Sequence, residues 1–237
     1  MIDVHTHILP KMDDGSASVE ESIQMLQSCV QQGIQTVVLT PHFYASQDAP
    51  ERFLLRRARA FEVLQQEVKK QQLPVQLRLG SEVHFYRGIG CSESIRRLAI
   101  EDTNCILVEL PFSHRNQYAD IAVELKELRS QGLQVILVHI ERYMTRWNQE
   151  RILNELQDAG VYFQCNAEFF IGKTQKRAIR LLKQGKIHLL GSDCHNMTDR
   201  VPNLRTALHI IQEKAGADVL EQLEQQSVQL LGWDGVR

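Results

Sequence analysis

The sequence predicts a single α/β domain in which seven parallel strands alternate with helices and close into a barrel. Short β-branched runs alternate with longer amphipathic stretches along the whole chain. The short runs are almost continuously apolar, which is typical of parallel strands buried on both faces. A length of 237 residues is common for an α/β barrel, so one domain spanning residues 1–237 is expected.

Seven segments have the composition of strands. They are Ile2–His5, Gln35–Thr40, Val75–Glu82, Cys105–Leu110, Gln134–His139, Val161–Asn166 and Ile187–Ser192. No glycine-rich nucleotide-binding motif (GxGxxG or GxxxxGK[ST]) follows any of them. An open doubly wound sheet is the alternative to a closed barrel.

Seven helices are expected from the amphipathic stretches. The first begins after Ser18, which has capping-box spacing to Glu21, and it ends at Gly33. The second covers Glu51–Gln72 and stops before Pro74. The others are Tyr118–Gln131, Glu150–Ala159, Thr174–Gln184, Asn203–Ala215 and Asp218–Leu231.

The overall composition points to a protein of the cytoplasm. A formal net charge of -2 gives no electrostatic reason to expect nucleic acid or an anionic membrane as partner. There is no secretory signal and no apolar run of transmembrane length. The five cysteines form no CxxC pair, so they are expected to be reduced thiols.

Histidine, aspartate and glutamate cluster at the strand ends. These residues are His5, His7, His42, Glu82, Glu109, His139, Asp193 and His195. One such residue alone is more often a cap or a surface group, but six of the seven strand ends carry one. Because the C-terminal ends of parallel strands meet at one rim of a barrel, these side chains should converge. The apolar run before Glu109 should not bury a carboxylate without a compensating charge, which a divalent metal would supply.

The ligand types favour a catalytic metal cluster. Imidazole and carboxylate suit Zn²⁺, Mn²⁺ or Fe²⁺, and the strand ends lack the cysteines of a structural zinc site. The candidates exceed what one tetrahedral ion can use, so two or three ions are expected, with Glu82 or Asp193 as a bridge. Such clusters serve hydrolysis, since one ion activates water while the others hold the electrophile.

Three more residues could extend this site. Asp14 lies in the loop after the first strand and could reach a third ion, although a turn carboxylate is almost as good an explanation. Arg142 follows His139 by three residues, and Arg200 follows His195 by five. Forked guanidinium donors match phosphate oxygens, so the arginines suggest a phosphoryl substrate, with surface ion pairs as the alternative.

Several motifs together resemble those of the PHP (polymerase and histidinol phosphatase) superfamily. They are Asp3-Val4-His5-Thr6-His7, Thr40-Pro41-His42, Gly80-Ser81-Glu82, Val138-His139 and Gly191-Ser192-Asp193-Cys194-His195. Three longer motifs are similar to the bacterial PHP-type protein-tyrosine phosphatases that regulate capsule and exopolysaccharide synthesis. These are His5–Pro10 with Asp13-Asp14-Gly15, His139-x-Glu141-Arg142 and Ser192-Asp193-x-His195-Asn196. The resemblance spans essentially the whole chain.

This resemblance implies a distorted (β/α)7 TIM-like barrel that holds three divalent ions, with Mn²⁺ expected and iron or zinc as alternatives. The implied ligand sets are His5, His7, Glu82 and Asp193; Glu82, Glu109 and His139; and Asp14, His42 and His195. Arg142 and Arg200 match phosphate-binding arginines, and Asp193 and His42 are counted with them as catalytic. One departure is Ile140, where the family commonly has proline after the histidine.

Four alternatives compete with this interpretation. A thiol phosphatase would use a Cys-x5-Arg loop, which Cys91 to Arg97 and Cys194 to Arg200 match by spacing. In the first loop, which lacks glycine, the charge of Glu93 would repel a phosphate ligand. In the second, a low-pKa thiolate is not expected beside the Asp193 carboxylate. An amidohydrolase also opens with His-x-His but would need a bridging lysine at a strand end, where this chain has Glu109. A histidinol-phosphate phosphatase shares the metal set, and a non-catalytic metal-binding domain is the last alternative.

The hypothesis is therefore hydrolysis of phosphotyrosine on a protein, by in-line attack of a metal-bound hydroxide without a covalent phosphoenzyme. The family analogy makes a bacterial tyrosine kinase the expected partner. Glu141 is a candidate for orienting the ligands. The aromatic residues Phe43, Tyr44 and Phe85 could contact the phosphotyrosine ring or serve in packing.

Overall fold

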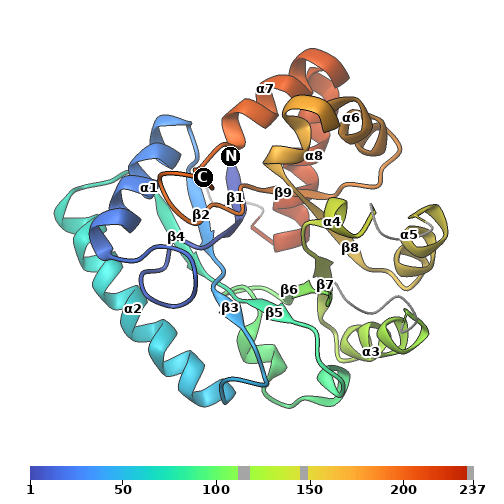
Figure 1. Ribbon diagram of the computed structural model, residues 1–237, viewed down its shortest axis with the longest axis horizontal. Helices are drawn as coiled ribbons and strands as arrows, with labels where there is room; N and C mark the ends of the chain where they lie inside the picture. Colours follow the sequence, from blue (N-terminus) through green and yellow to red (C-terminus); the bar gives the residue numbers. More distant parts are fainter. Residues whose placement is uncertain (112–117, 145–148, 234–237) are drawn as a thin grey trace.

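The strands of the computed structural model lie at the centre of the molecule, with the helices arranged around them (Figure 1). The structure describes residues 1–111, 118–144 and 149–233. One sheet has the order β1-β2-β4, formed by Ile2–Thr6, Thr36–Leu39 and Gln76–Leu79. All of its pairs are parallel.

A second sheet has the order β3-β5-β6-β7-β8-β9. Its strands are His42–Phe43, Glu82–His84, Cys105–Glu109, Gln134–Leu137, Tyr162–Asn166 and Leu189–Gly191. Every pair is again parallel. A bridge between Thr6 and Cys194 brings the end of β1 beside the residues that follow β9. The sheets therefore curl so that the first and last strands are neighbours, and the expected parallel α/β fold is confirmed.

The predicted strand Val75–Glu82 is wrong as one continuous strand. It is divided into β4 and β5, with Gly80 and Ser81 between them. The buried guanidinium of Arg57 donates to the Gly80 carbonyl at 2.7 Å and to Ser81 Oγ at 2.6 Å, so a side chain replaces a ladder hydrogen bond there. The neighbouring strand is interrupted at the same level, between β2 and β3, where Pro41 has no amide hydrogen to donate.

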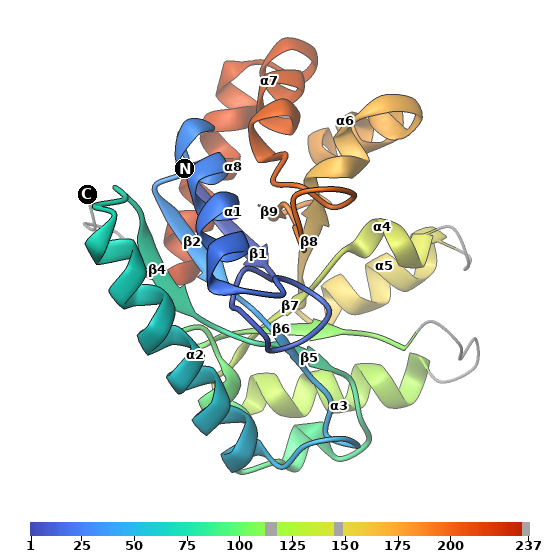
Figure 2. The same ribbon diagram turned by 60° about the vertical axis from the view of Figure 1, so that its left-hand side comes forward.

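The predicted helices are all present, with ends that shift by one or two residues. They are α1 (Val19–Gln31), α2 (Pro50–Lys70), α3 (Tyr118–Ser130), α5 (Gln149–Asp158), α6 (Gln175–Lys183), α7 (Leu204–Ala215) and α8 (Ala217–Leu231). Ser18 Oγ accepts from Glu21 N as the capping-box spacing predicts, and Gly33 follows α1 with a φ of 80°. A short helix, α4 (Ile140–Met144), was not predicted. Figure 2 shows the long α2 passing along the outside of the strands.

Strand β6 shows how the sheet separates the core from the site. Ile106 and Val108 pack in the large cluster that the outer helices join, whereas Cys105 and Leu107 pack in a smaller inner cluster. Side chains alternate along a strand, so Glu109 continues the inner row at its C-terminal end. The alternation thus places a carboxylate directly above an apolar inner core.

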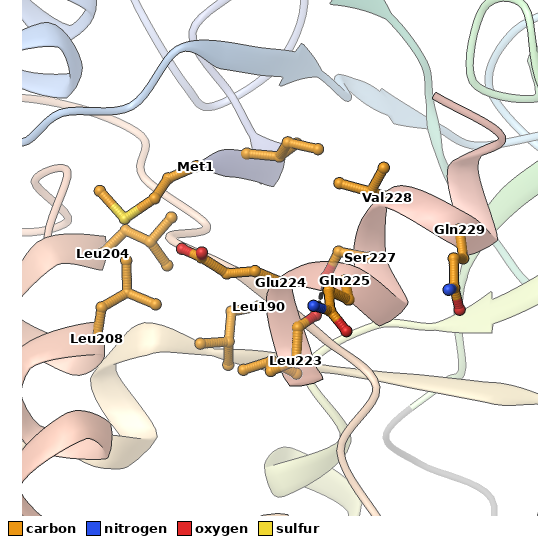
Figure 3. Close-up of a pocket in the computed structure, with 11 residues that line it drawn as sticks. Met1, Leu190, Leu204, Leu208, Leu223, Glu224, Gln225, Ser227, Val228 and Gln229 are labelled. Carbon is orange, nitrogen blue, oxygen red and sulfur yellow. Dashed lines mark hydrogen bonds between the residues drawn. The ribbon is translucent and has the colours of Figure 1, made fainter. Parts of the chain in front are cut away.

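The N-terminal ends of the strands are covered by α8. Its residues Leu230 and Leu231 pack with Val4 in the inner cluster. Beside them, a cavity of about 280 Å³ lies between α7, α8 and the start of β1 (Figure 3). Its walls are mainly apolar, from residues such as Met1, Leu190, Leu204, Leu208, Leu223 and Val228. Among the described residues, no helix combines the length and apolar composition needed to cross a membrane.

Candidate metal centre

The structure brings the predicted ligands together at the C-terminal ends of the strands. They come from β1, β3, β5, β6 and the segments that follow β1, β7 and β9. The set is His5, His7, Asp14, His42, Glu82, Glu109, His139, Asp193 and His195. The convergence expected from a shared rim is confirmed, although Glu82 begins β5 instead of ending a strand.

Glu82 is the hub of this cluster, and it is 1% exposed. Its Oε2 lies 3.1 Å from Nε2 of His5, 3.1 Å from Nε2 of His7 and 3.0 Å from Nδ1 of His42. Its Oε1 lies 2.8 Å from Nε2 of His139. Burial raises the pKa of a carboxyl group, but the surrounding imidazoles hold the pKa of Glu82 well below its usual value.

Three overlapping groups have ligand atoms close enough to share an ion. Within each group the atoms lie within 4.8 Å of one another. The groups are His7, Asp14, His42 and His195; His5, His7 and Asp193; and His42, Glu82 and Glu109. His139 joins the third group through its Nε2, which is 3.4 Å from Glu109 Oε1.

Asp14 is the exposed member of the cluster. Its side chain is 69% exposed, and Oδ1 lies 3.7 Å from Nε2 of His42 and 3.5 Å from Nε2 of His195. A turn carboxylate without a functional role would not need to face two imidazoles. Asp14 therefore lies at the solvent side of the cluster, facing His42 and His195.

Two facing imidazoles show why the cluster needs a cation. His7 Nδ1 lies 2.7 Å from Asp13 Oδ2, and His5 Nδ1 lies 3.3 Å from Gln164 Oε1. These acceptors place a hydrogen on each Nδ1, so the two Nε2 atoms turn their lone pairs toward each other at 3.2 Å. Such lone pairs repel unless a proton or a metal ion lies between them.

The pKa values in the cluster agree with this requirement. Burial alone lowers the pKa of an imidazole, but Asp13 and Glu82 raise the pKa of His7 well above its usual value. For His195, burial and the neighbouring His7 lower the pKa to about 4. His195 is therefore neutral at physiological pH and can offer a lone pair.

The donor set fits divalent metal ions. In the part of the chain that the structure describes, the buried atoms Glu82 Oε2 and His195 Nε2 make no hydrogen bond. His195 Nδ1 lies 3.0 Å from the Asp193 carbonyl, which leaves Nε2 with its lone pair directed at the cluster. Buried acceptor atoms without donors are costly, and imidazole with carboxylate is the donor set of Mn²⁺, Fe²⁺ and Zn²⁺.

Two of the candidate ligands have an unusual backbone conformation. His139 and Asp193 have φ values of 35° and 53°, in the left-handed region that non-glycine residues seldom occupy. Gly191 lets β9 approach β1 closely, because a Cβ there would lie 2.5 Å from the Cβ of His5. The backbone is therefore locally strained at His139 and Asp193, whose side chains point into the cluster.

Two arginines converge on Asp193 at the edge of the cluster. Arg200 Nη2 donates to Asp193 Oδ2 at 2.7 Å, and Arg142 Nη2 donates to the same oxygen. Each arginine is 36% exposed, so its guanidinium also reaches solvent. Asn196 Oδ1 accepts from Arg200 N at 3.1 Å and His195 N donates to the Arg200 carbonyl at 2.8 Å, which fixes the arginine's backbone.

Comparison with known proteins identifies the family of this chain. The family described as "Capsular polysaccharide synthesis, CpsB/CapC" matches residues 1–231. This chain belongs to the CpsB/CapC family. The predicted resemblance to capsule-regulating tyrosine phosphatases is thereby confirmed.

Several members of the CpsB/CapC family are similar over nearly their whole length. Tyrosine-protein phosphatase YwqE of Bacillus subtilis (strain 168) is 30% identical over 236 residues, which cover 98% of this chain and 91% of that protein. Tyrosine-protein phosphatase CpsB of Streptococcus pneumoniae is 31% identical, with 94% of each chain covered. A solved structure from work on YwqE and CpsB, described as unique metal-dependent tyrosine phosphatases, matches with a TM-score of 0.83 and 27% identity. That match covers 97% of this chain and 94% of the other.

The departure from the family pattern at Ile140 leaves the site intact. Ile140 is the first residue of α4, a position that also suits proline. Its side chain is 1% exposed and packs in the large apolar cluster. Arg142 lies in the same helix, and its backbone N donates to the His139 carbonyl at 2.9 Å.

The prediction missed four residues that contact the candidate ligands. Asp13 and His84 bond to ligands, since His84 Nδ1 lies 3.0 Å from Glu109 Oε2. Gln164 and Asn166 are buried on β8 and reach the ligands through their amides. The signal for Gln164 was present, because an apolar strand that buries an amide needs partners for it just as one that buries Glu109 does.

The three aromatic residues considered for the phosphotyrosine ring differ in burial. Phe43 and Phe85 are buried and belong to the large apolar cluster. Tyr44 is half-buried, and its ring lies 5.3 Å from the ring of His42 and 5.2 Å from that of His84. Of the three, Tyr44 is the one placed beside the ligands.

The cysteines do not have the setting of catalytic thiolates. Cys194 is completely buried, and burial raises its pKa well above the usual value. Cys91 is exposed, but the adjacent Glu127 raises its pKa. Since a reactive cysteine requires a lowered pKa, both Cys-x5-Arg matches arise from spacing alone.

Glu141 accepts from the Cys165 thiol at 3.1 Å, and burial raises the pKa of this carboxyl group.

Proposed function

We propose that this chain is a metal-dependent protein-tyrosine phosphatase. The observation that carries the proposal is the meeting of Arg142 and Arg200 at Asp193, on the edge of a buried cluster of metal-ligand side chains. Two partly exposed guanidinium groups beside such a cluster suit a dianionic phosphoryl group. The relatives YwqE and CpsB carry the name tyrosine-protein phosphatase, which supports phosphotyrosine as the substrate.

The ligand groups would hold three divalent ions, with Mn²⁺ as the expected metal and iron or zinc as alternatives. His5, His7, Glu82 and Asp193 would serve one ion, and Glu82, Glu109 and His139 another. Asp14, His42 and His195 would serve the third. When bound, the ions supply an activated water molecule and a positive field for the phosphoryl oxygens. Glu82 lies within 3.1 Å of four imidazole nitrogens, so its carboxylate would contribute to more than one of these groups.

The chain's own groups would bind and orient the substrate. Arg142 and Arg200 would donate to phosphoryl oxygens, and charge on those oxygens would be neutralised as it develops in the transition state. Asp193 would hold both guanidinium groups in place while its other oxygen faces His5 and His7. The rings of His42 and Tyr44 lie 5.3 Å apart, and Tyr44 would contact the tyrosyl ring of the substrate.

The physiological setting follows from the family. We propose that the substrate is a phosphotyrosine protein, with a bacterial tyrosine kinase of capsule or exopolysaccharide synthesis as partner, acting in the cytoplasm. Residues 1–237 would form one phosphatase domain. Within it, β2 with β3 and β4 with β5 would each form one interrupted strand of a distorted seven-stranded barrel.

The test is hydrolysis of a phosphotyrosine peptide before chelation, after chelation and after metal is returned. We expect chelation to abolish hydrolysis, Mn²⁺ to restore it, and alkylation of cysteines to leave it unchanged. Activity that survives complete metal removal but is lost on thiol alkylation would refute the proposal. Histidinol phosphate serves as the small-molecule substrate for comparison. A clear preference for it over the phosphotyrosine peptide would indicate a small-molecule phosphatase instead of a protein phosphatase.

A further inference from the structure

Strand β8 differs from its neighbours at the metal centre. The strands and loops around it contribute histidines and carboxylates, whereas β8 contributes two amides, Gln164 and Asn166. Gln164 is 0% exposed and Asn166 is 6% exposed. The two residues are two positions apart, so their side chains project from the same face of the strand.

The Gln164 amide connects two candidate ligands that are far apart in sequence. Its Oε1 accepts from the backbone N of His139 at 2.8 Å and from Nδ1 of His5 at 3.3 Å. Its Nε2 donates to Asn166 Oδ1 at 3.1 Å. A Cβ at Gly191 would lie 2.9 Å from Gln164 Nε2, so the glycine leaves room for the amide.

Asn166 continues this chain of hydrogen bonds to Asp193, which follows β9. Its Nδ2 donates to Asp193 Oδ2 at 2.7 Å, the oxygen on which Arg142 and Arg200 also converge. Its backbone N donates to the buried Glu141 carboxyl group at 3.3 Å. Both ends of the amide pair therefore reach residues with left-handed backbone, His139 and Asp193.

We propose that Gln164 and Asn166 are positioning residues that form an amide relay, which fixes the His5 ring and joins it to His139 and Asp193. This inference rests on the proposed metal-dependent phosphatase function and extends it to residues that would not touch the ion. The carbonyl oxygen of Gln164 can only accept, so it selects the His5 tautomer with hydrogen on Nδ1. Nε2 then keeps its lone pair for the metal.

The relay predicts a large difference between two substitutions at one position. Gln164→Met keeps the length and removes the polar atoms, so the bonds to His5 and His139 are lost. Gln164→Glu keeps an acceptor for both hydrogens and strengthens the bond to the imidazole. It also replaces the Nε2 donor to Asn166 Oδ1 by an oxygen, so this variant keeps the orientation of His5 and loses only the link to Asn166. Loss of a group that orients a metal-bound histidine typically lowers metal affinity about ten- to hundredfold.

The experiment measures Mn²⁺ affinity by titration calorimetry of the full chain after chelation. We expect Gln164→Met to weaken Mn²⁺ binding about ten- to hundredfold. Gln164→Glu should weaken it less than Gln164→Met does, because only the link to Asn166 is lost. Asn166→Leu, which removes the donor to Asp193, should weaken it about tenfold. Tyr162→Phe is the matched control, since Tyr162 lies on the same strand and contacts His188 instead of the ligands.

A second readout requires no metal. Long-range proton–nitrogen NMR of the chelated protein with labelled histidine reports the tautomer of each neutral ring. The Nδ1–H form of His5 should be present in wild type and Gln164→Glu and absent or mixed in Gln164→Met. Packing alone would not restore this signal in the glutamate variant.

Three outcomes would overturn the inference: equal Mn²⁺ affinity in wild type, Gln164→Met and Gln164→Glu; equal weakening in both variants; or an unchanged His5 tautomer in Gln164→Met. An unchanged affinity in Asn166→Leu would remove Asn166 from the relay. These measurements do not use a phosphorylated substrate. If the chain fails to hydrolyse phosphotyrosine peptide while the binding and tautomer results hold, the proposed substrate is wrong and the relay stands.

Discussion

The two ends of the strands carry opposite kinds of side chain. At the C-terminal ends, buried histidines and carboxylates face one another within hydrogen-bonding distance. At the N-terminal ends, leucines of α7 and α8 surround a mainly apolar cavity beside the start of β1 (Figure 3). One set of strands thus supports both ends, and the difference lies in the residues that follow or precede each strand.

This contrast separates function from stability. The polar end holds charged groups that are costly to bury, together with left-handed backbone at His139 and Asp193. The apolar end holds none of the candidate ligands and is covered by Leu230 and Leu231 of α8. Changes at the polar end should therefore affect turnover, and changes at the apolar end should affect the free energy of unfolding.

The largest effect is expected from Asp193→Asn. This change removes the charge that faces His5 and His7 and that holds Arg142 and Arg200. We expect kcat/KM for a phosphotyrosine peptide to fall at least about a thousandfold, since several kcal/mol of transition-state stabilisation would be lost. Steady-state kinetics with saturating Mn²⁺ measure it.

Asp199→Asn is the control for charge in the same loop, because Asp199 is exposed and lies outside the cluster. It should retain wild-type kinetics. If the turnover of Asp193→Asn stays within tenfold of wild type, the polar end does not control turnover as we propose. The functional difference between the two ends would then be contradicted.

A smaller loss is expected from Arg200→Lys. Lysine keeps the charge but cannot present two parallel donors, so it cannot replace guanidinium on both Asp193 and a phosphoryl group. One charge-assisted hydrogen bond is worth about 1.5–3 kcal/mol, which corresponds to about a ten- to hundredfold loss in kcat/KM. Arg205→Lys on α7 is the control and should leave the kinetics unchanged; equal effects of the two changes would contradict the role of Arg200.

Much of the fold could be predicted from the sequence because its signals are local. Apolar runs marked the strands, and caps such as Ser18 and Gly33 marked helix ends. The break between β4 and β5 could not be predicted, since it depends on Arg57 reaching from another element. Helix α4 was missed because five residues are too short for a helical pattern to appear.

The convergence of the candidate ligands was predictable for a similar reason. Parallel strands bring their ends together, so position along each strand was enough to select His5, Glu109 and Asp193. The partners of those ligands depend on side-chain directions that spacing does not give. Asp13 and Gln164 therefore emerged only from three-dimensional contacts.

The buried carboxyl group of Asp3, two residues before His5 in β1, gives a pH-dependent test of stability. Burial raises its pKa from 3.8 to about 6, although Ser192 N and His5 N both donate to it. Between pH 3.8 and about 6 the folded chain holds a proton that the unfolded chain has released, so this group lowers stability as pH rises.

Asp3→Asn should remove that slope while an amide oxygen keeps both backbone hydrogen bonds. Between pH 3.5 and pH 7, the free energy of unfolding of the variant should rise by up to about 3 kcal/mol relative to that of wild type. Chemical denaturation of the chelated proteins at several pH values measures this difference. Parallel stability curves for the two proteins would show that Asp3 is ionised as easily in the folded chain as in the unfolded one.

The smallest effect is expected at the apolar end, from Leu208→Ala. Leu208 is 8% exposed and lines the cavity between α7, α8 and β1. Truncation of a buried leucine costs about 2–5 kcal/mol, and about 2 kcal/mol is expected here because the side chain already borders open space. Denaturant unfolding measures this loss, and kcat/KM for the folded protein should stay within about twofold of wild type. A tenfold fall in turnover without a matching loss of stability would mean that the apolar end is coupled to the metal centre, and the division between the two ends would then fail.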